Sequence, residues 1–266
     1  MKGCDISHFQ GTPDFHAIRD NLQFVIIKAT DGVAFVDPQF IRNRDEARKV
    51  GLLIGYYHFA EPNDNPPEAE ADWFCKNISC LPGEIACLDF EINYPDPVTW
   101  CRNFLDKVKS NMGFKPLVYL NQALIKKYDW SPIINAGYGL WLAQYDYNPD
   151  GTPVPTPWNT VAIRQYSNKG NVAGITPLDL DVFYGDENQF KLYGNPPPPI
   201  LEPQPPQTPP SVSEQPTISC EDKLALLEEE CQNLNEKLNA ITSVITSKNF
   251  WFIKYWKIKD IILGKS

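Results

Sequence analysis

Two carboxylates stand two positions apart at the end of an apolar run, in Cys87-Leu88-Asp89-Phe90-Glu91. Because side chains alternate along a strand, Asp89 and Glu91 would share one of its faces. Repulsion between two buried carboxylates raises one pKa and leaves a protonated acid beside an ionised partner. Hydrolysis of a glycosidic bond uses such a pair. The alternative, a strand end that faces solvent, is favoured only if the pair stands alone.

Further aspartates occur near both ends of the region that contains this pair. Asp5 follows Gly3-Cys4 in a short apolar run, and Asp179 and Asp181 alternate with leucines in a late one. In a closed barrel the first and last strands are neighbours, so Asp5 and Asp179 can converge on the pair. Catalytic side chains of barrels come from the ends of several strands. The four carboxylates therefore form the candidate catalytic set.

Aromatic and amide side chains follow the same predicted strand ends. Such groups suit a sugar polymer, because rings stack on pyranose faces and amides bond to N-acetyl and hydroxyl groups. Packing in the core is the alternative for any single ring, and we expect it for about half of them. The candidate substrate-binding residues are Tyr57, Tyr119, Trp141, Gln144 and Gln165.

Other catalytic chemistry has little support in the sequence. There is no Ser-centred nucleophile elbow, and His58, within Gly-Tyr-Tyr-His-Phe, is more typical of a packed strand histidine than of a base. The seven cysteines lack the paired spacing of a zinc site, so we expect free thiols, no metal and no cofactor.

The residues that must position these groups alternate between apolar runs and helix-like segments up to about residue 195. The predicted strands are 3–7, 24–30, 53–59, 85–91, 116–121, 140–145, 161–166 and 179–184. The predicted helices are 13–21, 38–50, 66–78, 97–112 and 122–128, with no helical period after about residue 130. This order predicts an α/β barrel that begins as β/α units and ends in bare strands. An open doubly wound sheet is the alternative, disfavoured because no Gly-rich phosphate loop is present.

Composition restricts the class of protein. The chain has 266 residues, a net charge of −9 and 42% hydrophobic residues, which suits one large domain with an appendage. The acidic balance argues against nucleic acid as a partner. The first residues hold no apolar signal region, so we expect synthesis in the cytoplasm without a signal peptide. No apolar run is long enough to span a membrane.

The region after residue 195 differs in composition from the barrel region, 1–195. Ten prolines within 196–216 predict a semi-rigid linker over 196–219. A heptad pattern in 224–245 predicts a coiled-coil oligomerisation helix over 220–247, or alternatively a helix docked on the barrel. Residues 248–266 carry five lysines and one aspartate among aromatic rings, which suits a membrane surface or an anionic wall polymer.

The fragments GCDISHFQG, FVIIKATDG, GLLIGYYHFAEP, CLDFE, PLVYLN, LWLAQY and RQYSNKGNVAGITPLDLDVF occur in this order. Together they resemble the muramidases of glycoside hydrolase family 25, over about residues 2–186. The resemblance implies a modified TIM-like (β/α)5(β)3 barrel that cleaves the β-1,4 bond between N-acetylmuramic acid and N-acetylglucosamine in peptidoglycan.

Site roles also follow from this resemblance. It implies Glu91 as the general acid, with Asp89 stabilising positive charge or orienting the substrate acetamido group and with Asp5 and Asp179 completing the cluster. The family often has Asn where this chain has Asp181, so either aspartate of that strand could face the site, and Asp179 is favoured.

We therefore expect a phage lysin that acts on the bacterial cell wall. Its expected partners are peptidoglycan, further copies of the chain through 224–245, and a wall or membrane surface through 248–266. The alternatives are a non-catalytic carbohydrate-binding barrel and a structural virion component. Residue spacing leaves open whether the anomeric configuration is retained or inverted, and the resemblance favours retention.

Overall fold

The structure is a computed structural model that describes residues 1–195 and the single positions Gln232, Glu236 and Asn239. Apart from those three positions, the predicted linker (196–219), coiled coil (220–247) and cationic tail (248–266) lie outside the described residues. The predicted barrel region can therefore be compared with the structure, and the three C-terminal predictions remain predictions.

One sheet of nine strands forms the centre of the described region, and eight of these strands close into a barrel because β1 pairs with both β2 and β9. The short β3 extends β2 outside the ring. Neighbouring strands are parallel from β1 through β2 and β4 to β8, whereas β9 is antiparallel to both β8 and β1. The strands are β1 (Lys2–Ile6), β2 (Phe24–Asp31), β3 (Phe35–Val36), β4 (Leu53–Phe59), β5 (Ile85–Asp89), β6 (Leu117–Asn121), β7 (Leu140–Ala143), β8 (Val161–Val172) and β9 (Ile175–Phe183).

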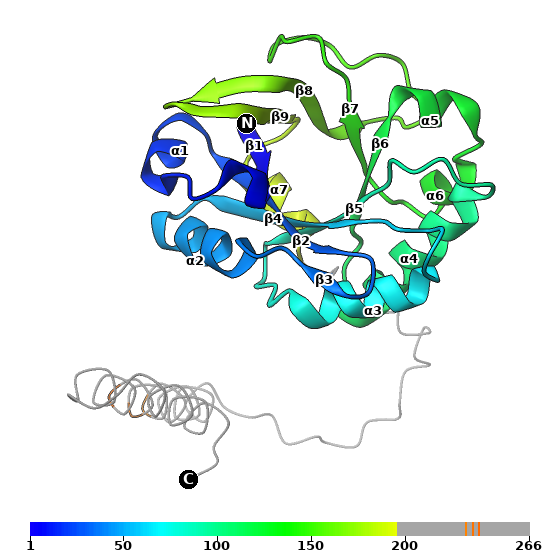
Figure 1. Cartoon of the computed structure of the whole chain (residues 1–266), viewed down its shortest axis with the longest axis horizontal. Helices are drawn as coiled ribbons and strands as arrows, with labels where there is room; N and C mark the ends of the chain where they lie inside the picture. Colours follow the sequence, from blue (N-terminus) through cyan, green and yellow to red (C-terminus); the bar gives the residue numbers. More distant parts are fainter. Residues whose placement is uncertain (196–231, 233–235, 237–238, 240–266) are drawn as a thin grey trace, which may run out of the picture. The chain divides into compact units, whose positions relative to one another are not determined.

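Helices connect the first strands and surround the ring (Figure 1). Their ends follow ordinary capping chemistry: Asp14 and Asp96 accept backbone N–H groups at helix starts, and Gly51 and Gly113 end helices at positive φ, where glycine is unstrained. The helices are η1 (His8–Gln10), α1 (Phe15–Asn21), α2 (Phe40–Val50), α3 (Pro67–Asn77), α4 (Pro97–Met112), α5 (Gln122–Lys127), α6 (Ser131–Asn135) and α7 (Glu187–Tyr193).

Alternating strand residues build two separate apolar cores. Outward side chains such as Leu88 pack beneath the helices, and inward side chains such as Cys87 fill the barrel. Helix α7 lies at one end of the barrel, where Phe190 contacts Phe24 at 5.4 Å and Phe183 at 5.2 Å between ring centroids. That end is closed, so the opposite end, where β1 to β7 finish, is the open mouth of the barrel.

The barrel prediction is confirmed: a strand or helix of the structure overlaps every predicted one, although β8 runs six residues beyond its expected end. The expectation of no helix after residue 130 is wrong, because α6 and α7 follow. Each is at most seven residues long, too short for a helical period to show in the sequence.

Two further structural facts concern the described residues only. No helix among them is long and apolar enough to cross a membrane. Five cysteines lie there, all as free thiols, and three of these are buried.

Candidate active site

The carboxylate pair lies where β5 reaches the mouth. Asp89 is the last residue of β5, 9% exposed, and it follows Cys87 on the inward face. Leu88 and Phe90 belong to the outer core, as the alternation predicts. Glu91, two positions after Asp89, is exposed at the rim. A buried carboxyl and an exposed one thus stand side by side on a single strand end.

The two terminal strands add three aspartates to the same mouth. Asp5 on β1 is directly opposite Asp179 on β9, and Asp5 lies near the end of β1 that reaches the mouth of the barrel. Asp179 is half-buried at the mouth, while Asp181, one inward position further along β9, is 0% exposed. Both aspartates of β9 therefore face inward, at different depths, and Asp179 is the one near solvent.

Burial and mutual repulsion shift these carboxyls toward their neutral forms. Burial raises the pKa of Asp5, Asp89, Glu91 and Asp179, and nearby carboxylates raise the first three further. Burial also raises the pKa of Asp181 to about 7. The cluster therefore holds several protons under mildly acidic conditions.

A buried lysine faces this cluster and was not among the predicted site residues. Lys28 is 9% exposed and continues the inward face of β2 defined by Phe24 and Ile26. Its ammonium pairs with Asp31 at 2.8 Å. Its positive charge lowers the pKa of Asp89, against the larger effect of burial. The sequence signal for Lys28 was its place on the inward face of an otherwise apolar strand.

Three of the predicted sugar-binding residues belong to hydrogen-bond networks that hold aspartates of the cluster in place. The Tyr119 and Tyr145 hydroxyls each donate to Gln165 Oε1 at 2.8 Å, and Gln165 Nε2 donates to Asp5 at 2.6 Å. Trp141 Nε1 donates to Asp181 at 2.8 Å. Tyr119, Trp141 and Gln165 are at most 4% exposed. Their polar atoms are bonded within the protein and their faces are covered in this structure, and their role as sugar contacts stays a prediction.

The remaining two predicted sugar contacts differ from each other. Gln144 is buried and bonds to Asp146, the carbonyl of Thr152 and the N–H of Val154, so it holds the loop after β7, and its role as a sugar contact stays a prediction. Tyr57 is half-buried and close to the acidic cluster, because Asp5 and Asp89 both raise the pKa of its hydroxyl. Tyr57 keeps its assignment as a candidate substrate contact.

His58 lies on the outer side of the barrel wall. Its Nδ1 bonds to the Thr30 hydroxyl at 2.8 Å, its Nε2 to Glu70 at 2.7 Å, and its ring stacks on Phe104 at 5.0 Å between centroids. The side chain is 0% exposed beneath α3 and α4. His58 is therefore a packing histidine, and Thr30 and Glu70 satisfy both of its nitrogens.

Exposed rings occur on the rim near the acids, where the sequence analysis had not placed candidate residues. Phe9, in η1 directly after β1, is 81% exposed, and Phe35 of β3 is 40% exposed. The His8 ring lies between them, with its centroid 4.2 Å from that of Phe9 and 6.1 Å from that of Phe35, and its Nδ1 bonds to Asp37 at 2.7 Å.

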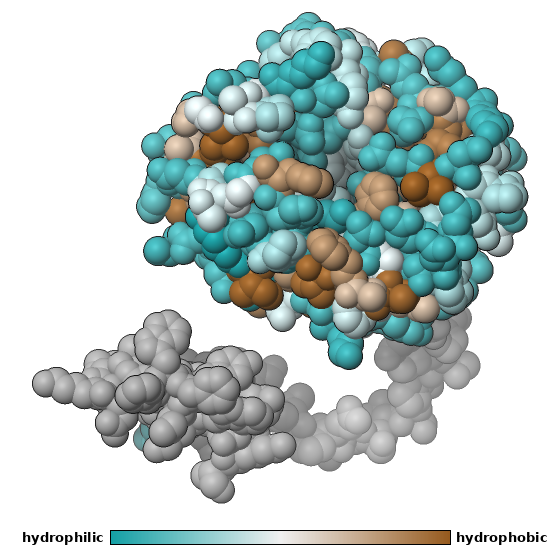
Figure 2. All heavy atoms as spheres, in the orientation of Figure 1, coloured by the Kyte–Doolittle hydropathy of each residue, from teal (hydrophilic) through white to brown (hydrophobic). Residues whose placement is uncertain are grey.

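The face of the molecule in Figure 2 is mostly hydrophilic, with apolar residues in separate patches.

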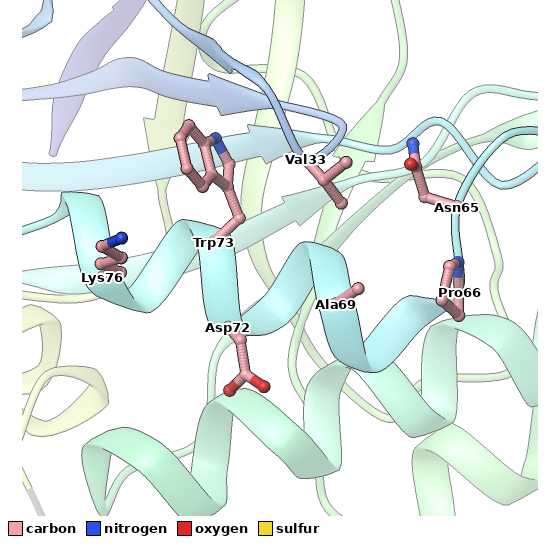
Figure 3. Close-up of a pocket in the computed structure, with 7 residues that line it drawn as sticks. All are labelled: Val33, Asn65, Pro66, Ala69, Asp72, Trp73 and Lys76. Carbon is pink, nitrogen blue, oxygen red and sulfur yellow. The ribbon is translucent and has the colours of Figure 1, made fainter.

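A cavity of about 430 Å³ lies beside the mouth and not over the acids. It is lined by Val33, before β3, and by the loop and helix of α3, including Trp73 (Figure 3). Asp72 points away from it toward α4, where Lys107 and Asn111 bond to it. Among the described residues, no group of three His, Cys, Asp or Glu side chains is arranged to hold a metal ion.

Comparison with known proteins agrees with this geometry. The sequence model of glycosyl hydrolases family 25 matches residues 4–175. The chain belongs to this family. It is 33% identical over 190 residues to the autolytic lysozyme of Clostridium acetobutylicum, covering 69% of this chain and 56% of that protein. The chain thus spans little more than half the length of that relative.

Solved structures of the family share the barrel. The bacterial lysozyme of Streptomyces coelicolor matches with a TM-score of 0.64 and 25% identity, over 73% of this chain and 97% of that one. The CTP1L endolysin matches with a TM-score of 0.62 and 30% identity, over 71% of this chain and 68% of that one. The predicted resemblance to family 25, and with it a glycoside hydrolase barrel, is confirmed.

Proposed function

We propose that this chain is a muramidase that hydrolyses the β-1,4 bond between N-acetylmuramic acid and N-acetylglucosamine in bacterial peptidoglycan. The observation that carries the proposal is the exposed Glu91 beside the buried Asp89 at the mouth of a family 25 barrel. The lysozymes among its relatives agree with it. Glycoside hydrolysis needs a proton donor next to an ionised carboxylate, and this pair can supply both.

The surroundings of the two carboxyls assign their roles. Burial and the charge of Asp179 raise the pKa of Glu91, which favours the protonated form that can give its proton to the leaving oxygen. Burial and the charge of Glu91 raise the pKa of Asp89 and the charge of Lys28 opposes this shift; in its ionised form Asp89 would face the positive charge that develops on the sugar. Asp5 and Asp179 complete the acidic cluster at the mouth of the barrel.

Digestion of purified cell walls tests the activity. We expect turbidity to fall and new reducing ends to appear on N-acetylmuramic acid, which distinguishes a muramidase from enzymes that cut the alternate glycosidic bond. Chelator should leave the rate unchanged, because no step of this scheme uses a metal. Reducing ends on N-acetylglucosamine alone would contradict the proposed bond specificity.

We further propose that the chain serves as a phage lysin acting on the cell wall. Its likeness to the CTP1L endolysin supports this role, at 30% identity over 71% of the chain. Expression of the chain inside bacteria, with and without permeabilisation of the membrane, tests it. A lysin that needs help to cross the membrane should lyse the cells only after permeabilisation, and lysis without it would contradict this role.

The heptad of 224–245 supports a proposal about assembly. Apolar residues recur there with alternating spacings of three and four, typical of a coiled coil, so we propose that the chain forms a small oligomer. Oligomers would present several copies of the cationic 248–266 tail to the wall or membrane, which strengthens weak binding. Light scattering should report an oligomer for the full chain and a monomer for a chain that ends at residue 195. A monomeric full chain at micromolar concentration would contradict the coiled coil.

A further inference from the structure

The floor of the acidic cluster contains a carboxyl group to which the proposed reaction gives no role. Asp181 is 0% exposed on the inward face of β9. Its partners across the sheet are Gly3 on β1 and Gln165 on β8. Gly3 offers no side chain, and Gln165 directs its Nε2 to Asp5 at 2.6 Å. A charged group in this position must find its hydrogen bonds within the barrel.

The hydrogen bonds of Asp181 are incomplete. Its Oδ1 accepts the Trp141 indole N–H at 2.8 Å, and its Oδ2 has no donor among the described residues. Asp5 is the next inward residue of β1 after Gly3, so its carboxyl is the neighbouring acidic group on that strand, and the two carboxyls interact with each other. Two carboxyl groups in contact can bond to each other only when one of them carries a proton. An unprotonated pair would place two charges together in a dry interior.

We propose that Asp5 and Asp181 hold one proton between them, and that Asp181 is a positioning residue which fixes the Asp5 carboxyl through this shared proton. The shared proton itself follows from the contacts of the pair. Its effect on turnover rests on the proposed function, in which Asp5 belongs to the reacting cluster.

On β1, β5, β8 and β9 the groups that act on the pair are acidic or neutral, and Lys28, on the inward face of β2, pairs with Asp31. The groups that interact with the charge of Asp181 are Cys4 on β1, Asp179 on β9 and Cys87 on β5. From β8, Tyr166 lies close by, while the cation of that strand, Arg164, bonds to Asp146 in the outer loop. No cation among the groups that act on Asp181 therefore favours its ionised form. Burial agrees with this, because it raises the pKa of Asp181 to about 7.

The pair has two states with different consequences for Asp5. With one proton, it carries a single negative charge and an internal hydrogen bond. When this remaining proton leaves, the two carboxylates repel each other and the bond between them is lost, while Gln165 still donates to Asp5. Asp181→Asn keeps a neutral donor toward Asp5 and removes the second ionisation, so it separates the hydrogen bond from the titration.

Carbon-13 NMR of the aspartate carboxyl carbons in the full chain tests the shared proton. In the wild type we expect resonances that titrate together near neutral pH. This step should vanish in Asp181→Asn and in Asp5→Asn, and remain in Asp20→Asn, an exposed aspartate of α1. If every aspartate of the wild type titrates below about pH 5, no proton is shared and the proposal fails. The Asp5→Asn variant serves as the test if Asp181→Asn does not fold.

The pH dependence of kcat/KM on soluble wall fragments tests the positioning role. We compare kcat/KM of Asp181→Asn with that of the wild type at each pH. As the pH increases beyond the titration step, this ratio should increase by at most about tenfold per pH unit, the slope of one ionisation. A merely structural role would change both rates by the same factor at every pH. A ratio independent of pH would therefore overturn the positioning role. A wild type without any wall-cleaving activity would instead refute the proposed function, and the NMR titration would still decide the shared proton.

Discussion

Asp89 and Glu91 stand two positions apart, yet different charges act on them. Asp89 is 9% exposed, and burial and the charge of Glu91 raise its pKa while the Lys28 ammonium lowers it. Glu91 is at the rim, and burial and the charge of Asp179 raise its pKa. A nearby cation favours an ionised carboxyl and a nearby anion favours a protonated one. Lys28 therefore favours ionisation of Asp89, against the effect of burial.

Replacement of Lys28 tests this division of roles. In Lys28→Met the cation is lost, so the pKa of Asp89 should rise and the acidic limb of the kcat/KM profile should move to higher pH. Activity near pH 5 should fall more than activity near neutrality. Lys169→Met, an exposed lysine of β8, is the matched control and should leave the profile in place. An unchanged acidic limb in Lys28→Met would contradict the role of this lysine.

The carboxyl cluster could be predicted from single residues, and the depth of the aromatic and amide side chains could not. Strand alternation and barrel closure fix which face Asp89 and Asp5 take. Alternation gives the face of a strand and not the depth or the hydrogen-bond partner of a side chain such as Trp141. Trp141 is on the inward face but 2% exposed, and its N–H belongs to Asp181.

At the scale of elements, η1 gives the rim its most exposed ring. Ser7 and Gln10 form a capping box around this short helix, which fixes its backbone, and Phe9 projects with 81% of its surface exposed. An apolar ring held rigidly beside the acidic mouth suits contact with a pyranose face. The ring contributes little to folding, because it buries so little surface.

Truncation of this ring separates substrate contact from stability. Phe9→Ala should raise KM for wall fragments several-fold, with kcat and thermal unfolding nearly unchanged, since the ring touches no reacting group. Leu192→Ala is a suitable control, because Leu192 is also well exposed, at 69%, but lies on α7 at the closed end. Equal kinetics for Phe9→Ala and the wild type would remove Phe9 from the substrate-binding surface.

The elements themselves were largely predictable, for physical reasons that vary along the chain. Buried strands such as β2 and β4 are apolar on both faces, which sets them apart from loops. Helix α6 has five residues and α7 has seven, so neither completes the two turns that a periodic pattern needs. Strand β9 runs antiparallel because a tight connection joins it to β8. Such a connection gives no periodic pattern of apolar residues in the sequence.

At the scale of the whole barrel, the acidic floor ties stability to pH. A carboxyl whose pKa is raised on folding stabilises the folded state below its unfolded pKa, near 4, and this contribution is lost as pH rises through the folded pKa. For Asp181 the folded value is about 7, which corresponds to at most about 4 kcal/mol. Stability from this group should therefore decrease between about pH 4 and pH 7.

Chemical unfolding at several pH values measures this effect. The wild type should lose more stability than Asp181→Asn as pH rises from 5 to 8, and the difference between the two should grow over that interval. The comparison isolates Asp181 from His58, whose burial lowers its pKa and acts in the opposite direction. A difference that is the same at every pH would show that Asp181 has an ordinary acidic pKa in the folded protein.

The central claim is that Glu91 is the general acid of a muramidase, and Glu91→Gln tests it most directly. This variant keeps the shape of the side chain and removes its proton, so kcat/KM on purified walls should fall by about 10²–10⁴-fold with thermal unfolding unchanged. Glu68→Gln, an exposed glutamate in the first turn of α3, should retain the full rate. A folded Glu91→Gln protein that lyses walls at nearly the wild-type rate would contradict the assignment.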